Sequence, residues 1–204
     1  MLFVILARAG SKRIPGKNTI DLRFCGKSLV EWAAVQGAEI ALALDVPSMI
    51  CVSSDHQPTL DFLQRPPLHV VPVVRPAELA GDDARSEDGI RHAVVEMRRA
   101  IGFGARTVCL LQPSNPLRDL RDCVEVIEHV RSGQCQSAFT ARASGAPDGN
   151  CYAINAEALL AGFGMQTAPT YRVFPTAASV DIDTPEDLRT AETLFIHSDW
   201  MRLL

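Results

Sequence analysis

The sequence lacks an excess of positive charge. Its 204 residues contain 20 Lys and Arg against 24 Asp and Glu, which gives a formal net charge of −4. Proteins that bind nucleic acids normally present a basic face that displaces counterions from the phosphates. The charge balance therefore argues against a nucleic-acid partner and favours a small ligand.

Paired cysteines and long apolar runs are also missing. The six cysteines are scattered without a C-x-x-C pair, and several lie in apolar stretches such as residues 108–110. This spacing indicates neither a zinc site nor a disulfide framework. No apolar run approaches the ~18 residues that span a bilayer, and residues 1–7 lack the basic start of a signal peptide. We therefore expect a cytoplasmic protein with reduced thiols and no membrane partner.

Short apolar segments alternate with longer amphipathic ones. Strands are expected at residues 2–7, 49–53, 69–74, 106–112, 137–141 and 151–155, and helices at 28–44, 57–64, 87–100, 119–131 and 156–163. Continuous apolar strands indicate a sheet that is covered on both faces. Thr184, Pro185 and Asp187 supply an N-cap, a first-turn proline and an early acid for a last helix. The pattern predicts a single α/β domain over residues 1–204, with three α/β/α layers around a mostly parallel sheet.

A basic loop follows the first expected strand. The segment from Leu6 to Asn18 contains four basic residues and two glycines. Loops at the carboxyl ends of strands form the ligand sites of open α/β sheets, and a glycine-containing basic loop suits a triphosphate. The gap from Gly10 to Gly16 and Lys17 is one residue too long for a P-loop, and no G-x-G-x-x-G is present. The loop is therefore either an unusual phosphate site or a solvated basic turn.

Acidic residues gather at the other end of the sequence. Asp181 and Asp183 are separated by one residue, so in an extended segment both carboxylates point to the same side and can share a hard cation. Magnesium is the expected ion. An acidic turn before the last helix is the alternative interpretation. A metal–triphosphate ligand would require both the basic loop and this acidic segment.

Four segments, in order along the chain, resemble signatures of the acylneuraminate cytidylyltransferase family, which includes CMP-sialic acid synthetases. Residues 7–18 match A-R-x-x-S-K-x-x-x-x-K-N, residues 75–80 resemble R-P-A-E-L, and residues 181–188 match D-I-D-T-x-x-D-L. Residues 110–118 resemble L-L-Q-P-T-S-P-L-R, with Ser114 and Asn115 in place of the threonine and the serine. Four ordered matches make a specific signal. The resemblance implies a Rossmann-like nucleotidyltransferase fold and a CTP-dependent enzyme that transfers CMP to an acidic acceptor and releases pyrophosphate.

The resemblance also implies roles for single residues. The CTP-binding positions carry over to Arg8, Ser11, Lys12, Lys17, Asn18, Arg75 and Ser86. The catalytic positions carry over to Arg8, Lys17 and Asp183, and the Mg²⁺ ligands to Asp181 and Asp183. The ion would stabilise charge during in-line attack on the α-phosphorus. Gln112 matches a position near the acceptor, although a glutamine there can also cap the strand end.

The match breaks between Ala141 and Pro147. CMP-sialic acid synthetases carry some tens of extra residues here, followed by an R-P-N-G-x-x-Y segment in which this chain has Ala146 for the arginine. In that family the extra stretch contributes much of the sugar pocket and the dimer arm. The chain therefore lacks this arm near residues 142–147, and its absence weakens the inference of a homodimer from the resemblance.

The shortened region leaves two acceptors open. One interpretation is a trimmed enzyme for a sialic acid or another 3-deoxy-ulosonic acid. The other, which the short segment favours, is a smaller anion such as a phosphonate, because the chain resembles phosphonoformate cytidylyltransferases in outline. Two anions repel unless a cation screens them, so Arg118 and Arg142 join Gln112 as acceptor-binding candidates. A non-catalytic CTP-binding module is a third interpretation, against which the retained Lys17 and Asp183 argue.

Overall fold

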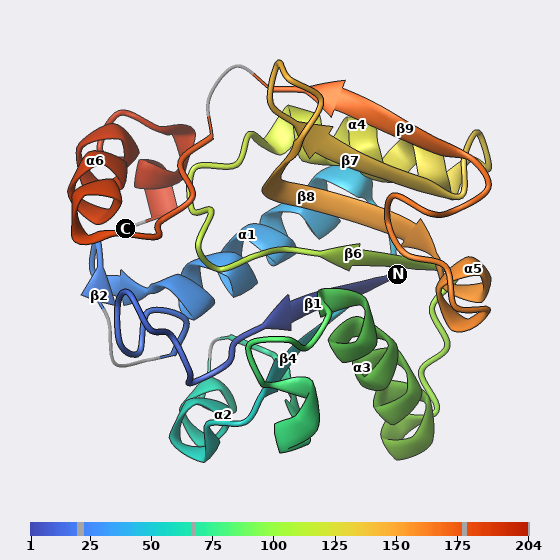
Figure 1. Cartoon of the computed structure of the whole chain (residues 1–204), viewed down its shortest axis with the longest axis horizontal. Helices are drawn as coiled ribbons and strands as arrows, with labels where there is room; N and C mark the ends of the chain where they lie inside the picture. Colours follow the sequence, from blue (N-terminus) through green and yellow to red (C-terminus); the bar gives the residue numbers. More distant parts are fainter. Residues whose placement is uncertain (20–22, 67, 177–178, 204) are drawn as a thin grey trace.

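A computed structural model of the chain describes residues 1–19, 23–66, 68–176 and 179–203. Within these residues, seven strands form the main sheet in the order β5-β4-β1-β6-β8-β7-β9 (Figure 1). They are β1 (Leu2–Leu6), β4 (Met49–Ser54), β5 (Val71–Val74), β6 (Thr107–Leu110), β7 (Ser137–Ala141), β8 (Pro147–Asn155) and β9 (Tyr171–Pro175). Only β8 runs antiparallel to its neighbours β6 and β7, and the other pairs in this sheet are parallel. The predicted mostly parallel sheet is confirmed.

Helices cover both faces of the sheet (Figure 1). The helices on one face are α1 (Leu29–Leu44), α2 (Gln57–Leu63) and α4 (Leu120–Arg131), and those on the other are α3 (Ser86–Ile101) and α5 (Ala156–Leu160). Each face of the sheet has its own apolar cluster. Side chains alternate along β1, so Phe3 and Ile5 belong to the cluster on the side of α1, α2 and α4, while Leu2 and Val4 belong to the cluster on the side of α3 and α5. This arrangement is the three-layer α/β/α fold predicted from the strand and helix pattern.

A third apolar cluster joins the two ends of the chain. The short hairpin of β2 (Arg23–Phe24) and β3 (Lys27–Ser28) packs with α6 (Pro185–Phe195), η2 (Asp199–Leu203) and the outer face of α1. The ring centroids of Trp32 and Phe195 are 4.6 Å apart. Ile14 from the loop after β1 and Ile182 from the segment before α6 belong to the same cluster. Their burial fixes the basic loop and the acidic segment next to each other.

The start of α6 follows the predicted capping pattern. The hydroxyl of Thr184 accepts a hydrogen bond from the Asp187 backbone N–H at 3.2 Å, and Asp187 Oδ2 accepts one from the Thr184 backbone N–H at 2.7 Å. Two orphan N–H groups of the first turn are thereby satisfied. The predicted role of these two residues in the helix start is confirmed.

Several elements differ from the expected ranges. The strand expected at residues 151–155 begins earlier, since β8 starts at Pro147, and β6 ends at Leu110 rather than at Gln112. The hairpin β2–β3 and the edge strand β9 are not predicted from the pattern. Strands of two residues are too short for periodicity, and β9 carries exposed side chains such as Tyr171 in place of a buried apolar run.

None of the helices in the described part of the chain combines the length and the apolar composition needed to cross a bilayer.

Candidate active site

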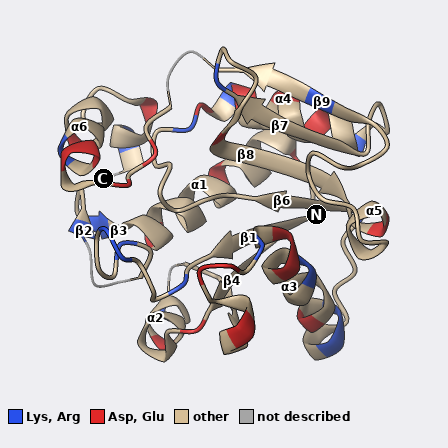
Figure 2. Ribbon diagram, viewed as in Figure 1, with Lys and Arg blue, Asp and Glu red and all other residues tan. Residues whose placement is uncertain are grey.

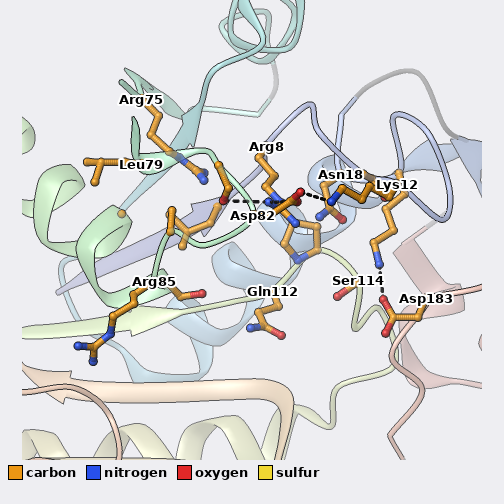
Figure 3. A pocket seen from close by; sticks show the side chains of 18 of the residues that line it. Arg8, Lys12, Asn18, Arg75, Leu79, Asp82, Arg85, Gln112, Ser114 and Asp183 are labelled. Carbon is orange, nitrogen blue, oxygen red and sulfur yellow. Dashed lines mark hydrogen bonds and ion pairs between the residues drawn. The ribbon is translucent and has the colours of Figure 1, made fainter. Parts of the chain in front are cut away.

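A pocket of about 400 Å³ opens at the carboxyl edge of the parallel strands. Its walls come from the loop after β1, the connection between β5 and α3, the residues after β6, and the segment before α6 (Figure 3). Carboxyl ends of parallel strands meet at one edge of a sheet, which is why loops far apart in the sequence converge here. Basic and acidic stretches of the two chain ends lie close together in this part of the molecule (Figure 2).

Most of the site residues predicted from the sequence line this pocket. They are Arg8, Ser11, Lys12, Lys17, Asn18, Arg75, Ser86, Gln112, Asp181 and Asp183. Four motif segments supply all of them except Ser86, which begins α3, and the tertiary structure brings the four segments together. These residues therefore share one pocket, while the individual roles assigned to them stay predictions.

The end of β4 holds the basic loop in place. The backbone N–H of Ala7 donates to the carbonyl of Ser53 at 3.0 Å, and the hydroxyl of Ser54 donates to the carbonyl of Ala7 at 2.5 Å. Asp55 Oδ1 accepts a hydrogen bond from the Ala9 backbone N–H at 2.8 Å. These contacts position the start of the loop before any ligand binds, and they give Asp55 a positioning role.

Asp183 binds the second half of the loop from the opposite wall. The side chain of Lys17 is largely buried, and its Nζ lies 2.8 Å from Asp183 Oδ1 and also donates to the carbonyl of Ile182. Arg13 Nη1 lies 3.0 Å from Asp183 Oδ2. Although Arg13 matches no fixed position of the family signature, the structure places it in the same ion-pair group as Lys17.

Asp82 binds the first half of the loop in the same manner. Arg8 Nη1 lies 3.0 Å from Asp82 Oδ1, and Lys12 Nζ lies 2.5 Å from Asp82 Oδ2, so one carboxylate bridges two cations (Figure 3). Arg8 also donates to the carbonyl of Gly81 at 3.0 Å. The hydrogen bond from Lys12, together with the charges of both cations, lowers the pKa of Asp82 below its ordinary value.

The sequence motifs single out neither Asp82 nor Arg85, which also lines the pocket. Both lie between the motif segment at residues 75–80 and Ser86, outside the four motif segments. In Figure 3, Arg85 lies at the end of the pocket away from Asp183. The signal that could have identified Asp82 is electrostatic, because four cations in one loop attract nearby carboxylates.

Arg75 is a buried cation at the back of the pocket. It is 5% exposed, and its Nε donates to the hydroxyl of Ser53 at 3.1 Å. Burial lowers the pKa of Arg75 to about 10, an effect that nearby Asp55 opposes and the charge of Arg8 reinforces. The guanidinium therefore remains charged at neutral pH and adds to the positive potential of the pocket.

The side-chain oxygen of Asn18 is shielded from solvent and has no hydrogen-bond partner among the described residues. Buried polar atoms in folded proteins are normally paired, so an unpaired one in a pocket wall is suited to a ligand donor. Asn18 therefore offers an acceptor to a bound molecule.

Asp181 and Asp183 both face the pocket, while Ile182 between them is buried in the third cluster. This alternation is the one predicted for an extended segment. No set of three or more His, Cys, Asp or Glu side chains in the described ranges could hold a metal ion alone. Mg²⁺ is commonly held by one or two carboxylates together with substrate phosphates, and the two aspartates fit such a donor set.

Two predicted acceptor-binding residues lie elsewhere. Arg118 is 1% exposed, and its guanidinium donates to the carbonyls of Asn150 and Gln112 at 3.0 and 2.5 Å and to Gln36 Oε1 at 2.6 Å. Arg142 is exposed in the turn between β7 and β8. Neither residue is placed to contact an acceptor in this pocket. The guanidinium of Arg118 donates to oxygens inside the protein, and Arg142 does not line the pocket.

Gly149 lies directly behind Gln112. Its φ is +88°, and a Cβ added there would be 2.6 Å from Gln112 Oε1 and 2.4 Å from Asn115 Nδ2. We expect Gly149→Ala to lower the free energy of unfolding by about 2–4 kcal/mol, because the methyl group displaces both amides and the backbone is strained. Urea denaturation followed by circular dichroism measures this.

Gly145→Ala is the matched control for Gly149→Ala. Gly145 has φ +83°, but a Cβ there meets nothing within 4 Å. It should show only the backbone cost of about 1–2 kcal/mol. Equal destabilisation in the two variants would contradict the steric part of the argument.

The chain is similar to a family sequence model, to curated proteins and to solved structures. The sequence model of a cytidylyltransferase family matches residues 2–154. Pseudaminic acid cytidylyltransferase of Campylobacter jejuni is 31% identical over 140 residues, which cover 69% of this chain and 57% of that protein. CMP-N,N'-diacetyllegionaminic acid synthase of Legionella pneumophila is 34% identical over 132 residues, 62% of this chain and 52% of that protein. The chain spans little more than half the length of these curated relatives.

Solved structures share the fold over nearly the whole chain. CMP:2-keto-3-deoxy-manno-octonic acid synthetase complexed with CTP has a TM-score of 0.68 at 18% identity and covers 96% of this chain and 98% of that one. A cytidylyltransferase from Leptospira borgpetersenii has a TM-score of 0.66 at 14% identity, with 96% and 86% covered. At such identities the likeness concerns the fold alone.

Proposed function

The chain belongs to the cytidylyltransferase family, and from this membership we propose that it transfers CMP from CTP to an anionic acceptor and releases pyrophosphate. The observation that carries the proposal is the pocket itself, in which the basic loop after β1 faces the carboxylates of Asp181 and Asp183. A triphosphate bound with a divalent cation requires charges of both signs at close range.

The loop cations would bind the phosphates. Arg8, Lys12 and Lys17 offer charge-assisted hydrogen bonds to phosphoryl oxygens. Lys17 is the candidate for stabilising charge that develops on the α-phosphoryl group, since its buried ammonium is held in place at the carboxyl edge of the sheet. An acceptor oxygen would attack the α-phosphorus, and the bond from that phosphorus to the bridging oxygen would break as pyrophosphate leaves.

The remaining residues of the pocket would bind the other parts of the substrates. Arg75 and Ser86 are proposed for the cytidine side, Asn18 for the phosphate side with the other loop residues, and Gln112 for the acceptor side. Mg²⁺, held by Asp181 and Asp183, would neutralise charge on the phosphoryl oxygens when bound. Asp183 is paired with Lys17 and Arg13, so these cations become available to phosphate if the carboxylate turns to the ion.

The relatives favour a sugar acid as the acceptor, since their names specify pseudaminic acid and N,N'-diacetyllegionaminic acid. A smaller anion such as phosphonoformate is the second candidate. One observation favours it: residues 142–146 form a tight turn between β7 and β8, with the Arg142 backbone N–H 2.9 Å from the Ala146 carbonyl. That turn leaves no insertion to enlarge the acceptor side.

The test is an assay of pyrophosphate release and product mass. The protein is incubated with each of the four ribonucleoside triphosphates, Mg²⁺, and pseudaminic acid, legionaminic acid, other 3-deoxy-ulosonates or phosphonoformate. We expect a CMP adduct with CTP only, and its loss when EDTA removes the metal. Binding of CTP without turnover on any acceptor would favour a non-catalytic CTP-binding module instead.

A further inference from the structure

Two carboxylates neutralise the basic loop in different ways. Asp183 pairs with Lys17, whose side chain is 10% exposed and which also donates to the Ile182 carbonyl. Asp82 pairs with Arg8 and Lys12, whose side chains are 35% and 81% exposed. Lys17 is thus a largely buried cation, although Asp183 also pairs with the exposed Arg13, whereas both cations bound by Asp82 are open to solvent.

The contacts of Asp82 are those of a bound oxyanion. Each of its oxygens meets a different cation, at 3.0 Å for Arg8 and 2.5 Å for Lys12. A phosphoryl group can accept charge-assisted hydrogen bonds from the same two donors, although its oxygens are arranged tetrahedrally and those of a carboxylate lie in a plane. The carboxylate and a phosphoryl group cannot occupy this position together, because their like charges repel.

We propose that Asp82 determines the affinity of the pocket for phosphoryl groups. Its carboxylate occupies an anion subsite between Arg8 and Lys12, and a nucleotide phosphate binds there by displacing it. The proposal rests on the proposed function, whose phosphate-binding loop contains both cations. Loss of these ion pairs costs little free energy, because solvent reaches all three side chains: Asp82 is 43% exposed, Arg8 35% and Lys12 81%.

The displacement makes binding depend on the number of phosphoryl groups. A triphosphate or pyrophosphate offers several anionic oxygens and competes well with one carboxylate, whereas a single phosphoryl group competes less well. Cytidine has no phosphate and does not compete at all. Asp82 therefore weakens the binding of ligands that carry few phosphoryl groups, a CMP adduct among them, and favours their release.

The variant Asp82→Asn tests this proposal, because asparagine keeps the shape of the side chain and removes its charge. Isothermal titration calorimetry with CTP, inorganic pyrophosphate and cytidine is carried out on the wild type and the variant. We expect the variant to bind CTP and pyrophosphate roughly three- to tenfold more tightly and cytidine without gain. The gain should shrink as salt is raised, since the competing contacts are exposed.

Asp83→Asn is the matched control. Asp83 is the next residue, is exposed, and lies outside the pocket lining, and the substitution changes the net charge by the same amount. Unchanged or weaker pyrophosphate binding in Asp82→Asn would overturn the proposal, as would an equal gain in Asp83→Asn. Failure of the wild type to bind CTP would contradict the proposed function instead, while the pyrophosphate comparison would still decide the role of Asp82.

Discussion

Asp183→Asn is expected to lower the rate of CMP transfer by about 10²–10³-fold, the range found when one preorganised charged contact is lost from an active site. Asparagine keeps the size of the side chain and an oxygen that can accept from Lys17 Nζ. It has no charge with which to hold Mg²⁺ or to balance Lys17 and Arg13. Initial rates of pyrophosphate release at saturating CTP and Mg²⁺ measure the effect.

Glu186→Gln provides the control for Asp183→Asn. Glu186 lies in the exposed first turn of α6, close in sequence, and is not part of the pocket lining. It loses the same charge and should keep the wild-type rate. Thermal unfolding of both variants shows whether the fold survives. A rate close to that of the wild type in a folded Asp183→Asn protein would remove Asp183 from the proposed metal site.

Lys17→Met is expected to lower kcat by about 10²–10³-fold and also to destabilise the fold. Methionine fills the channel of the aliphatic stem but cannot donate to Asp183 or to the Ile182 carbonyl. Loss of the donor leaves the carbonyl unsatisfied, which costs about 1–3 kcal/mol when the group is buried. Steady-state kinetics and urea denaturation measure the two effects separately.

The control for Lys17→Met is Lys27→Met, which removes a cation from the same part of the chain. Lys27 Nζ lies 5.0 Å from the centroid of the Trp32 ring and is absent from the pocket lining. Loss of this cation–π contact should cost about 0.5–1 kcal/mol and leave the rate unchanged. If Lys17→Met were stable and fully active, the proposed role of Lys17 in catalysis would be wrong.

Much of the fold could be predicted because its signals are local. The apolar run of β1, the amphipathic spacing of α4 and the capping residues Thr184 and Asp187 each act over a few neighbouring residues. The elements that escaped prediction lack such signals. The hairpin β2–β3 has strands of two residues, and β9 is recognisable as a strand only through its pairing with β7.

The residues that line the pocket could also be predicted in large part from the sequence. The motif segments contain the residues that line the pocket, and the spacing of Asp181 and Asp183 anticipates their common orientation. Arg118 shows where this approach fails. Its motif position is compatible with ligand binding, yet the fold buries its guanidinium against the carbonyls of Gln112 and Asn150, so it supports the site from behind.

The sequence by itself determined the α/β class, the helix starts and the residue types that gather at the carboxyl edge of the sheet, because these follow from contacts between near neighbours along the chain. Only the tertiary structure decided which carboxylate meets which cation. Asp82 reaches Arg8 and Lys12, and Asp183 reaches Arg13 and Lys17. Electrostatic pairing depends on distance in space, which is fixed when strands and the cluster around Ile14 and Ile182 pack together.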